Sequence, residues 1–517
     1  GSVLSDNKTD QAAWPKTFDL DEKTVSDLQG AVKSGEESAE SITQKYLDRI
    51  EEIDRNGPGV NSIIETNPDA MKIARELDAE RRAKGPRGPL HGMPILLKDN
   101  IETKDRMMTT AGSLALVGNY AADDSFIAAR LRKAGAIILG KTNLSEWANF
   151  RSTHSTSGWS GRGGQTKNPY ILDRNPCGSS SGSGAAAAAN LCAFAVGTET
   201  DGSIVCPSNN NGLVGIKPTL GLVSRTGIIP LSHSQDTAGP MARTVRDAAA
   251  LLNVLGGKDD RDAASKGFRG EADYTKFLDK NGLKGARIGV ARKFFGFSDS
   301  VDKVMESAID AMKQLGAEII DPADLPSQGK YDDTEFDVLL YDFKADINAY
   351  LTRPGMKIKP KSLEDLIKFD EENKDKEMPF FGQEVFLMAQ EKGPLTEQKY
   401  IDALEANHRL SRDEGIDAVV KEHKVDAIIA PTGGPAWTTD LINGDHFTGG
   451  SSTPAAVSGY PAITVPAGFV RGLPIGITFF GPAWSEATLI KLAYAFEQET
   501  KVRNAPKFLP TLEPKGQ

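Results

Sequence analysis

Between residues 94 and 197 the chain alternates short apolar segments with stretches of helical periodicity. Strands are expected at residues 94–98, 136–140 and 193–197, with helices at residues 125–133 and 184–192. Strands that alternate with helices are typical of an α/β fold with a mostly buried sheet. Three later strands are expected to join this sheet, at residues 425–430, 462–466 and 474–480, followed by a closing helix at residues 487–500.

No repeat period and no long proline-, glycine- or serine-rich linker divides the 517 residues, so we expect one domain over residues 21–510. Charge-rich residues 320–395 lack strand-like runs, which predicts a helical lobe at about residues 320–400. Two helices are expected before the sheet, at residues 38–55 and 68–84. The opening Gly-Ser is typical of an expression tag, so residues 1–20 are expected to be a tag-derived or flexible segment, and both a cytoplasmic and an exported location stay open.

The composition argues against several classes of protein. The formal charge is −10, from 61 basic and 71 acidic residues, and no basic stripe suggests nucleic-acid binding. The longest apolar runs, residues 185–189 and 193–196, are far shorter than the ~20 residues of a membrane span. Three cysteines (Cys177, Cys192 and Cys206) argue against a disulfide framework and a cysteine zinc site, and the six histidines form no His-Glu-x-x-His pair. We expect a soluble small-molecule enzyme, monomeric or homo-oligomeric, with no metal, cofactor, nucleic-acid or membrane partner.

Residues 135–142 formally match the phosphate-binding pattern Gly-x4-Gly-Lys-Thr. That loop needs a turning backbone whose N–H groups surround the phosphate, followed by a helix. Here the variable positions are Ala-Ile-Ile-Leu, so a buried strand and turn are expected instead. Ser327 and Lys330 match a Ser-x-x-Lys pair, but no Lys-Thr-Gly motif follows, and we assign this match to chance.

Residues 177–184, Cys-Gly-Ser-Ser-Ser-Gly-Ser-Gly, are the densest candidate for a functional segment. They allow three interpretations: a flexible linker, a Gly-x-Ser-x-Gly elbow with Ser180 as nucleophile, or a helix start that exposes backbone N–H groups and works with a second serine loop. The elbow requires a preceding strand and a downstream catalytic histidine, but residues 168–177 read as a loop with two prolines. The third interpretation fits the poly-alanine segment that follows.

A second serine, Ser203, lies in a glycine-containing turn after the strand expected at residues 193–197. Such a turn can direct consecutive backbone N–H groups at a developing oxyanion and present Ser203 beside them. Without a histidine, the serine needs another base. Lys98 lies at the end of an apolar strand, where burial would lower its pKa. A strand-end lysine is more often structural, so the residues alone leave this role open.

Together these segments resemble the amidase signature family over about residues 24–500. The motifs that carry the resemblance are residues 88–100, 140–147, 168–170, 176–182, 200–204 and 215–219. The resemblance implies one α/β domain with a large mixed central sheet covered by helices on both faces. Its core signature region would span residues 85–250.

The resemblance also implies the roles of the site residues in an amidase with a Ser-cisSer-Lys triad. Lys98 would be the base, Ser179 the proton relay after a cis peptide bond, and Ser203 the acylated nucleophile. Ser180 would support this arrangement. The backbone N–H groups expected to form the oxyanion hole are those of Thr200, Asp201, Gly202 and Ser203.

Two departures from the commonest family pattern indicate a branch. Asp201 stands where most members have glycine, and Val205 where many have arginine. With Cys177 and Cys206, these residues resemble the bacterial peptide amidases, which release ammonia from C-terminal carboxamides of peptides. The alternatives are a broader amidase, esterase or carbamate hydrolase for aryl or aliphatic substrates, and the amidase subunit of an amidotransferase. Four aromatic residues of the lobe are candidates to line the pocket, although packing in the core is the favoured role for each. They are Tyr341, Phe343, Phe380 and Phe381.

Overall fold

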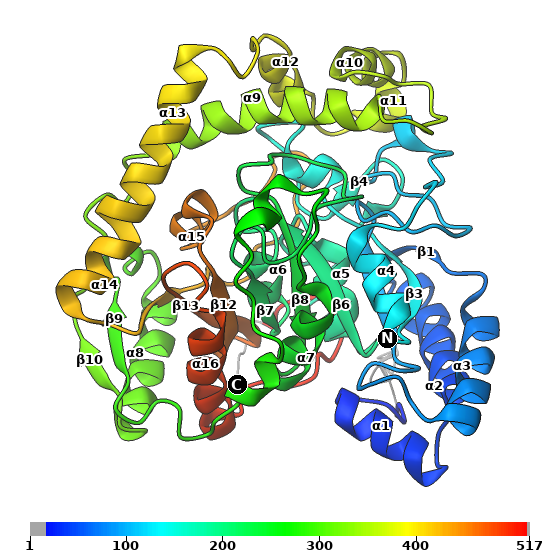
Figure 1. Cartoon of the computed structure of the whole chain (residues 1–517), viewed down its shortest axis with the longest axis horizontal. Helices are drawn as coiled ribbons and strands as arrows, with labels where there is room; N and C mark the ends of the chain where they lie inside the picture. Colours follow the sequence, from blue (N-terminus) through cyan, green and yellow to red (C-terminus); the bar gives the residue numbers. More distant parts are fainter. Residues whose placement is uncertain (1–16, 514–517) are drawn as a thin grey trace, which may run out of the picture.

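The computed structural model describes residues 17–513, and its centre is a single 11-stranded sheet (Figure 1). In space the strands follow the order β1-β3-β2-β6-β8-β7-β12-β13-β11-β9-β10. Their bounds are β1 Ile63–Thr66, β2 Pro94–Lys98, β3 Ile137–Thr142, β6 Phe194–Glu199, β7 Val214–Lys217, β8 Thr237–Ala242, β9 Arg287–Val290, β10 Glu318–Ile320, β11 Ala427–Pro431, β12 Ala462–Val470 and β13 Leu473–Phe480. A separate pair is formed by β4 Trp159–Ser160 and β5 Gly164–Gln165.

The sheet is mixed, as the family resemblance implies. Strand β2 lies between β3 and β6 and is parallel to both. From β6 to β11 the neighbours are antiparallel, and β9 is parallel to both β11 and β10. Every residue of β2, β3 and β6 is buried, which explains the short apolar run with which each of these strands begins. The segment that matched the phosphate-binding pattern is β3 and its preceding turn.

Helices cover both faces of the sheet. One group of helices forms a row, in which α4 contacts α7, α7 contacts α16, and α16 contacts α8. Helices α5 and α6 pack against each other as a second group. The bounds of the helices outside the lobe are α1 Val25–Ser34, α2 Ala39–Arg49, α3 Ala70–Lys84, α4 Phe126–Lys133, α5 Ser181–Ala188, α6 Val205–Asn210, α7 Val245–Leu255, α8 Asp299–Gln314, α14 Asp417–His423, α15 Thr453–Ser458 and α16 Glu486–Thr500. The helix expected at residues 38–55 is α2 followed by a π-helical segment, Ile50–Arg55.

Helix α5 lies unusually close to its neighbours because its first turns consist of serine and glycine. A Cβ atom at Gly182 would lie 2.2 Å from the carbonyl oxygen of Ser62 and 2.6 Å from the backbone of Asn143. The alanines that follow are fully buried. The small-residue segment is therefore a packed helix start, and the flexible-linker interpretation is wrong.

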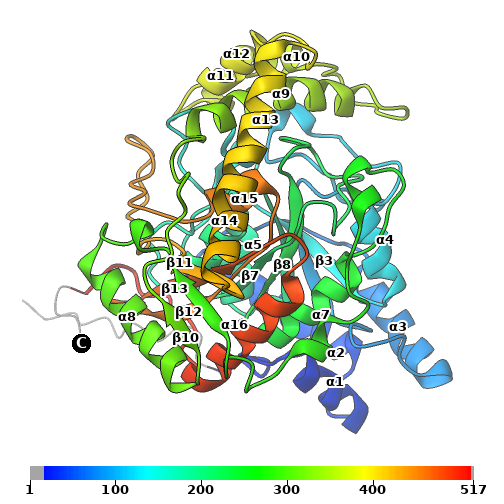
Figure 2. The same cartoon turned by 60° about the vertical axis from the view of Figure 1, so that its left-hand side comes forward.

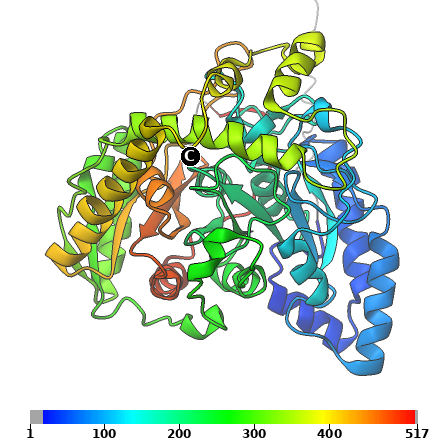
Figure 3. The same ribbon diagram turned by 45° about the horizontal axis from the view of Figure 1, so that its top comes forward.

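Helices α9 to α12 lie together at one end of the molecule, and α13 runs from this end toward α14 (Figures 1 and 2). Figure 3, which turns this end forward, shows the long helix α9 crossing the molecule. The bounds are α9 Asp332–Leu351, α10 Leu363–Glu372, α11 Lys374–Glu377, α12 Glu384–Gln390 and α13 Gln398–His408. A hydrophobic cluster joins these helices to the loop after β3 through Trp147, Phe343 and Phe386. The lobe boundaries drawn from the sequence stay a prediction.

The segment expected to be tag-derived or flexible falls mainly on residues 1–16, which lie outside the described residues. Phe18 packs against Tyr46, with ring centroids 5.9 Å apart, and Leu20 is buried. Within residues 17–513, no helix is both long enough and apolar enough to cross a membrane.

Candidate active site

Lys98 is the last residue of β2 and lies beside the end of β6. The two strands are parallel neighbours, so their carboxyl ends meet at one edge of the sheet. The Lys98 Nζ atom lies 2.8 Å from Thr198 Oγ1 and 3.3 Å from the Thr198 carbonyl oxygen. The lysine side chain is fully buried.

Ser179 provides the third atom within hydrogen-bond distance of the lysine nitrogen, after the two oxygens of Thr198. Its Oγ atom lies 2.7 Å from Lys98 Nζ, and the peptide bond between Gly178 and Ser179 is cis, as the resemblance implies. Burial lowers the pKa of Lys98 to about 7, and the carboxylates of Asp236 and Glu199 oppose part of this shift. A lysine that is neutral close to pH 7 can accept a proton from a neighbouring hydroxyl.

Ser180 connects the Ser179 loop to the two segments beside it. Its hydroxyl donates to the carbonyl oxygen of Thr198 at 2.9 Å and accepts from the Thr198 N–H at 3.0 Å. Its backbone N–H donates to the carbonyl oxygen of Ser203 at 3.2 Å. A loop, not a strand, precedes Ser180, so the nucleophile-elbow interpretation is wrong. The structure places Ser180 where it can hold Ser179 and Ser203 in adjacent loops.

Residues 200–203 form the turn between β6 and α6. Within residues 17–513, no hydrogen bond engages the backbone N–H groups of Asp201, Gly202 and Ser203. Unpaired backbone N–H groups are rare in folded proteins unless a ligand or solvent satisfies them. Three consecutive free donors beside a serine hydroxyl match the requirement of an oxyanion hole.

Glu199 fixes the far end of this turn. Its Oε1 atom accepts the N–H groups of Ile204 and Val205, at 2.9 and 3.1 Å. Gly202 has a φ of +89°, a conformation that glycine adopts without strain. A Cβ atom there would lie 3.1 Å from Ser452 Oγ, so the turn also approaches a neighbouring loop closely.

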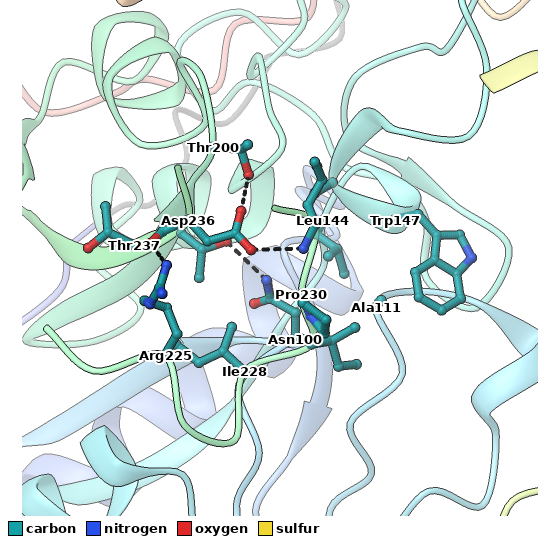
Figure 4. A pocket seen from close by; sticks show the side chains of 14 residues that line it. Asn100, Ala111, Leu144, Trp147, Thr200, Arg225, Ile228, Pro230, Asp236 and Thr237 are labelled. Atoms are coloured by element: carbon teal, nitrogen blue, oxygen red, sulfur yellow. Dashed lines mark hydrogen bonds between the residues drawn. The ribbon is translucent and has the colours of Figure 1, made fainter. Parts of the chain in front are cut away.

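Thr200 is held by the segment that precedes β8 (Figure 4). Its hydroxyl donates to Asp236 Oδ1 at 2.6 Å, while Asp236 Oδ2 accepts the N–H groups of Leu231 and Ser232 at 2.8 and 2.9 Å. Gln235 Nε2 donates to the Thr200 carbonyl oxygen at 3.0 Å. Burial raises the pKa of Asp236 to about 6. The turn is therefore anchored through both the side chain and the backbone of Thr200.

A cavity of about 20 Å³ lies beside Thr200 and Asp236 (Figure 4). Asn100, Thr198, Thr200 and Asp236 form part of its polar wall, and Trp147 contributes to its apolar wall. The volume corresponds to about one water molecule. This cavity is therefore too small to hold a peptide.

A larger pocket of about 310 Å³ is lined by Asp201 and Gly202 of the same turn. It reaches Gly178 and Gly202, the residues directly before Ser179 and Ser203. Ser203 keeps 9% of its surface exposed, whereas Ser179 is fully buried. The remaining residues that line the pocket are Asn149, Ser157, Cys177, Asp201, Val205, Cys206, Thr432, Trp437, Asp445, Phe447, Gly450, Ser452 and Thr453.

Cys177 and Cys206 are joined by a disulfide bond, which corrects the expectation drawn from the cysteine count. Their Cα atoms lie 5.9 Å apart although 29 residues separate them. The pairing depends on two loops that meet only in the folded chain, so neither the number nor the spacing of the cysteines reveals it. Cys192 is free and buried. The disulfide lines the pocket and links the Ser179 loop to helix α6.

The four aromatic residues considered as pocket-lining do not line this pocket. Phe343 stacks on Phe386, and Tyr341 donates to Glu397. Phe380 and Phe381 pack against Trp159. Within residues 17–513, no cluster of three or more histidine, cysteine, aspartate or glutamate side chains could hold a metal ion.

Some residues around the site were not singled out from the sequence. Thr198 and Asn100 had a detectable signal, because each is a polar residue within or beside a family-like motif. Asp236 and Gln235 lie more than thirty residues after Ser203 and reach the site only because β8 pairs with β6. No local pattern could have placed them there.

Comparison with known proteins identifies the family. The family model described as Amidase matches residues 41–490. The chain belongs to the amidase signature family. A probable amidase of Arabidopsis thaliana is 42% identical over 518 residues, which cover 98% of this chain and 96% of the plant protein.

Two solved structures of peptide amidases share this amidase fold closely. The native peptide amidase of Stenotrophomonas maltophilia superposes with a TM-score of 0.91 at 50% identity, covering 95% of this chain and 100% of that one. A peptide amidase in complex with the competitive inhibitor chymostatin gives a TM-score of 0.92 at 50% identity, with the same coverage. The protein is therefore an amide-bond hydrolase with an amidase-signature fold.

Proposed function

We propose that the protein is a peptide amidase that releases ammonia from the C-terminal carboxamide of a peptide. The observation that carries the proposal is the contact of 2.7 Å between Lys98 Nζ and Ser179 Oγ, made by a buried lysine whose pKa is about 7. The 50% identity to peptide amidases supports the substrate class. The pocket of about 310 Å³ beside Gly202 is large enough for the end of a peptide chain.

In this mechanism Ser203 Oγ attacks the carboxamide carbon. Its proton passes to Ser179, whose own proton passes to the neutral Lys98. The free N–H groups of the turn bind the oxygen of the tetrahedral intermediate. The Lys98 proton then returns through Ser179 to the leaving nitrogen, so that ammonia departs and an acyl-Ser203 ester remains.

Water completes the cycle by the same route. Lys98, neutral again, accepts a proton from water through Ser179 as the water oxygen attacks the ester. Collapse of the second tetrahedral intermediate returns that proton to Ser203 and releases the peptide acid. The net reaction consumes one carboxamide and one water and yields one carboxylic acid and one ammonia.

The test is ammonia release from a short C-terminally amidated peptide by the intact protein, by Ser203→Ala and by Ser180→Ala. Loss of release in Ser203→Ala is expected, because the nucleophile is gone. Ser180→Ala is the matched control: it removes a neighbouring serine hydroxyl that only supports the loop, so part of the activity is expected to remain. Release that survives in Ser203→Ala would overturn the assignment of the nucleophile.

The substrate class is tested with the intact protein on aryl amides, esters and carbamates. If these are hydrolysed while the amidated peptide is not, the peptide-amidase proposal is wrong and the broader hydrolase is correct. Loss of all activity in Ser203→Ala on such substrates would still support the same nucleophile.

A further inference from the structure

Asp201 places a carboxylate in the wall of the pocket, within the turn that carries the free N–H groups. It accepts hydrogen bonds from Ser452 Oγ at 2.6 Å and from Thr453 Oγ1 at 2.9 Å. Both donors line the same pocket, as does Gly202. The carboxylate therefore lies beside the position where a substrate carbonyl group would bind.

Glu335, from helix α9, is linked to the turn through Gln235, whose side-chain nitrogen donates both to Glu335 and to the Thr200 carbonyl oxygen. It is buried, and its Oε1 atom accepts from Gln235 Nε2 at 3.1 Å. Burial and the Asp201 carboxylate, through its charge and a shared hydrogen bond, raise the pKa of Glu335 well above its usual range. Two neighbouring carboxyl groups do not readily ionise together, so Glu335 holds its proton more strongly than an isolated glutamate does.

The hydrogen bonds of Asp201 are those of a carboxylate. Two hydroxyl groups donate to it, from Ser452 and Thr453. Asp445 is the other acidic residue among those that line the pocket, and these residues include no lysine, arginine or histidine. Lys217, a buried lysine near the turn, donates to the carbonyl oxygens of Ala455 and Tyr460 and does not line the pocket.

We propose that Asp201 is a specificity-determining residue that excludes carboxylates from the site. A C-terminal carboxamide is neutral and enters without penalty, whereas a C-terminal carboxylate at the turn meets the fixed charge of Asp201. The site thus rejects ordinary peptides with a free C-terminus and releases its own peptide-acid product. The inference rests on the proposed peptide-amidase function and names how that site recognises its substrate class.

The test compares the binding of a peptide acid and of its neutral alcohol analogue, in which –CH₂OH replaces the carboxylate. Both are titrated by calorimetry into Ser203→Ala protein, so that no turnover is needed. Glu335→Gln is the matched control, because it alters the neighbouring carboxyl group and leaves the charge on Asp201. The double variant Asp201→Asn/Glu335→Gln removes the charge, since neither side chain can ionise.

We expect the alcohol to bind more tightly than the acid by the same ratio in the Ser203→Ala protein and in its Glu335→Gln form. In the double variant the ratio should fall by about tenfold or more, because the acid gains affinity while the alcohol is unchanged. An unchanged ratio in the double variant would overturn the inference. If that variant does not fold, Asp201→Gly/Glu335→Gln provides the same comparison, with the residue most family members have at position 201.

Ammonia release by the intact protein separates this inference from the function on which it rests. If the intact protein hydrolyses the amidated peptide and the binding ratio does not change, the inference alone is wrong. If the intact protein releases no ammonia and binds neither analogue, the peptide-amidase function itself is wrong.

Discussion

Thr198 provides two acceptors for the side-chain nitrogen of Lys98, its hydroxyl oxygen at 2.8 Å and its carbonyl oxygen at 3.3 Å. A neutral lysine has two N–H groups and one lone pair. With both N–H groups directed at Thr198, the lone pair is left for Ser179, whose Oγ atom lies 2.7 Å away. The contacts of Thr198 therefore orient Lys98 as an acceptor for the proton of Ser179.

The first prediction concerns the pH dependence of kcat/KM. Burial lowers the pKa of Lys98 to about 7. The proposed mechanism needs the neutral lysine, so kcat/KM should rise as the pH increases through about 7 and then level off. Asp236 favours the protonated lysine, and Asp236→Asn should move this rise to lower pH by about one unit. The measurement is kcat/KM for an amidated peptide between pH 5 and 9.

Thr200→Ser is the control for this shift. It keeps the hydroxyl that donates to Asp236 and keeps the carboxylate, but removes a methyl group from the turn, so kcat can fall while the midpoint of the pH profile stays in place. An equal shift in both variants would mean that turn geometry, not the charge of Asp236, sets the pKa of Lys98.

A second prediction concerns the positive φ of Gly202. Gly202→Ala should destabilise the fold by about 1 kcal/mol and lower kcat about 10²-fold, because the shifted turn no longer aims its N–H groups correctly. Gly472→Ala is the matched control: Gly472 has a φ of +81° in the hairpin between β12 and β13, and no atom lies within 4 Å of its added Cβ. It should show a similar loss of stability in urea and a normal kcat. Equal kcat values for the two variants would contradict an oxyanion role for the turn.

A third prediction concerns the disulfide between Cys177 and Cys206. The bond closes a loop over 29 residues, so Cys177→Ser/Cys206→Ser should lower the free energy of unfolding by about 3–4 kcal/mol. It also ties the Ser179 loop to the helix after Ser203, so kcat should fall as well. A reductant should reproduce both effects in the intact protein and in Cys192→Ala, but not in the double variant. A reductant effect that requires Cys192 would contradict this assignment.

The sequence predicts those parts of the fold whose signal is local. The expected strand at residues 94–98 coincides with β2, and the helix expected at residues 125–133 begins one residue later as α4. Strands β7 and β8 were not expected. Thr237–Ala242 contains both glycine and proline, which disfavour strands, and it forms β8 because β6 and β7 pair with it on either side.

The same distinction applies to the site. Lys98, Ser179 and Ser203 lie in motifs that are recognisable one at a time, and the structure brings Lys98 and Ser179 into contact. Glu335 and Asp236 reach the turn through the lobe and through β8, so nothing near them in the sequence indicates their position. The approach of Glu335 and Asp236 to the turn depends on tertiary structure, as does the pairing of the two disulfide cysteines.

The last prediction concerns Asp370, a buried carboxyl group of the lobe that faces Glu377 and Arg151. Burial raises its pKa to about 8; Glu377 adds to this shift and Arg151 opposes it. Within residues 17–513, neither oxygen of Asp370 has a hydrogen-bond partner. The unfolded chain loses this proton near pH 4, whereas the folded chain keeps it until about pH 8. The stability that the protonated group contributes is therefore complete below about pH 4 and is lost progressively as the pH rises to about 8.

Asp370→Asn keeps the shape of the side chain but removes the titratable group, so this position no longer contributes to the pH dependence of the stability. Its free energy of unfolding should therefore increase relative to the intact protein as the pH rises from 4 to 8, with the difference constant above about pH 8. Urea unfolding at several pH values measures this difference. Asp375→Asn, which replaces an exposed carboxyl group on the same lobe, is the matched control for the substitution itself. A pH-independent difference for Asp370→Asn would show that Asp370 is already ionised in the folded protein at neutral pH.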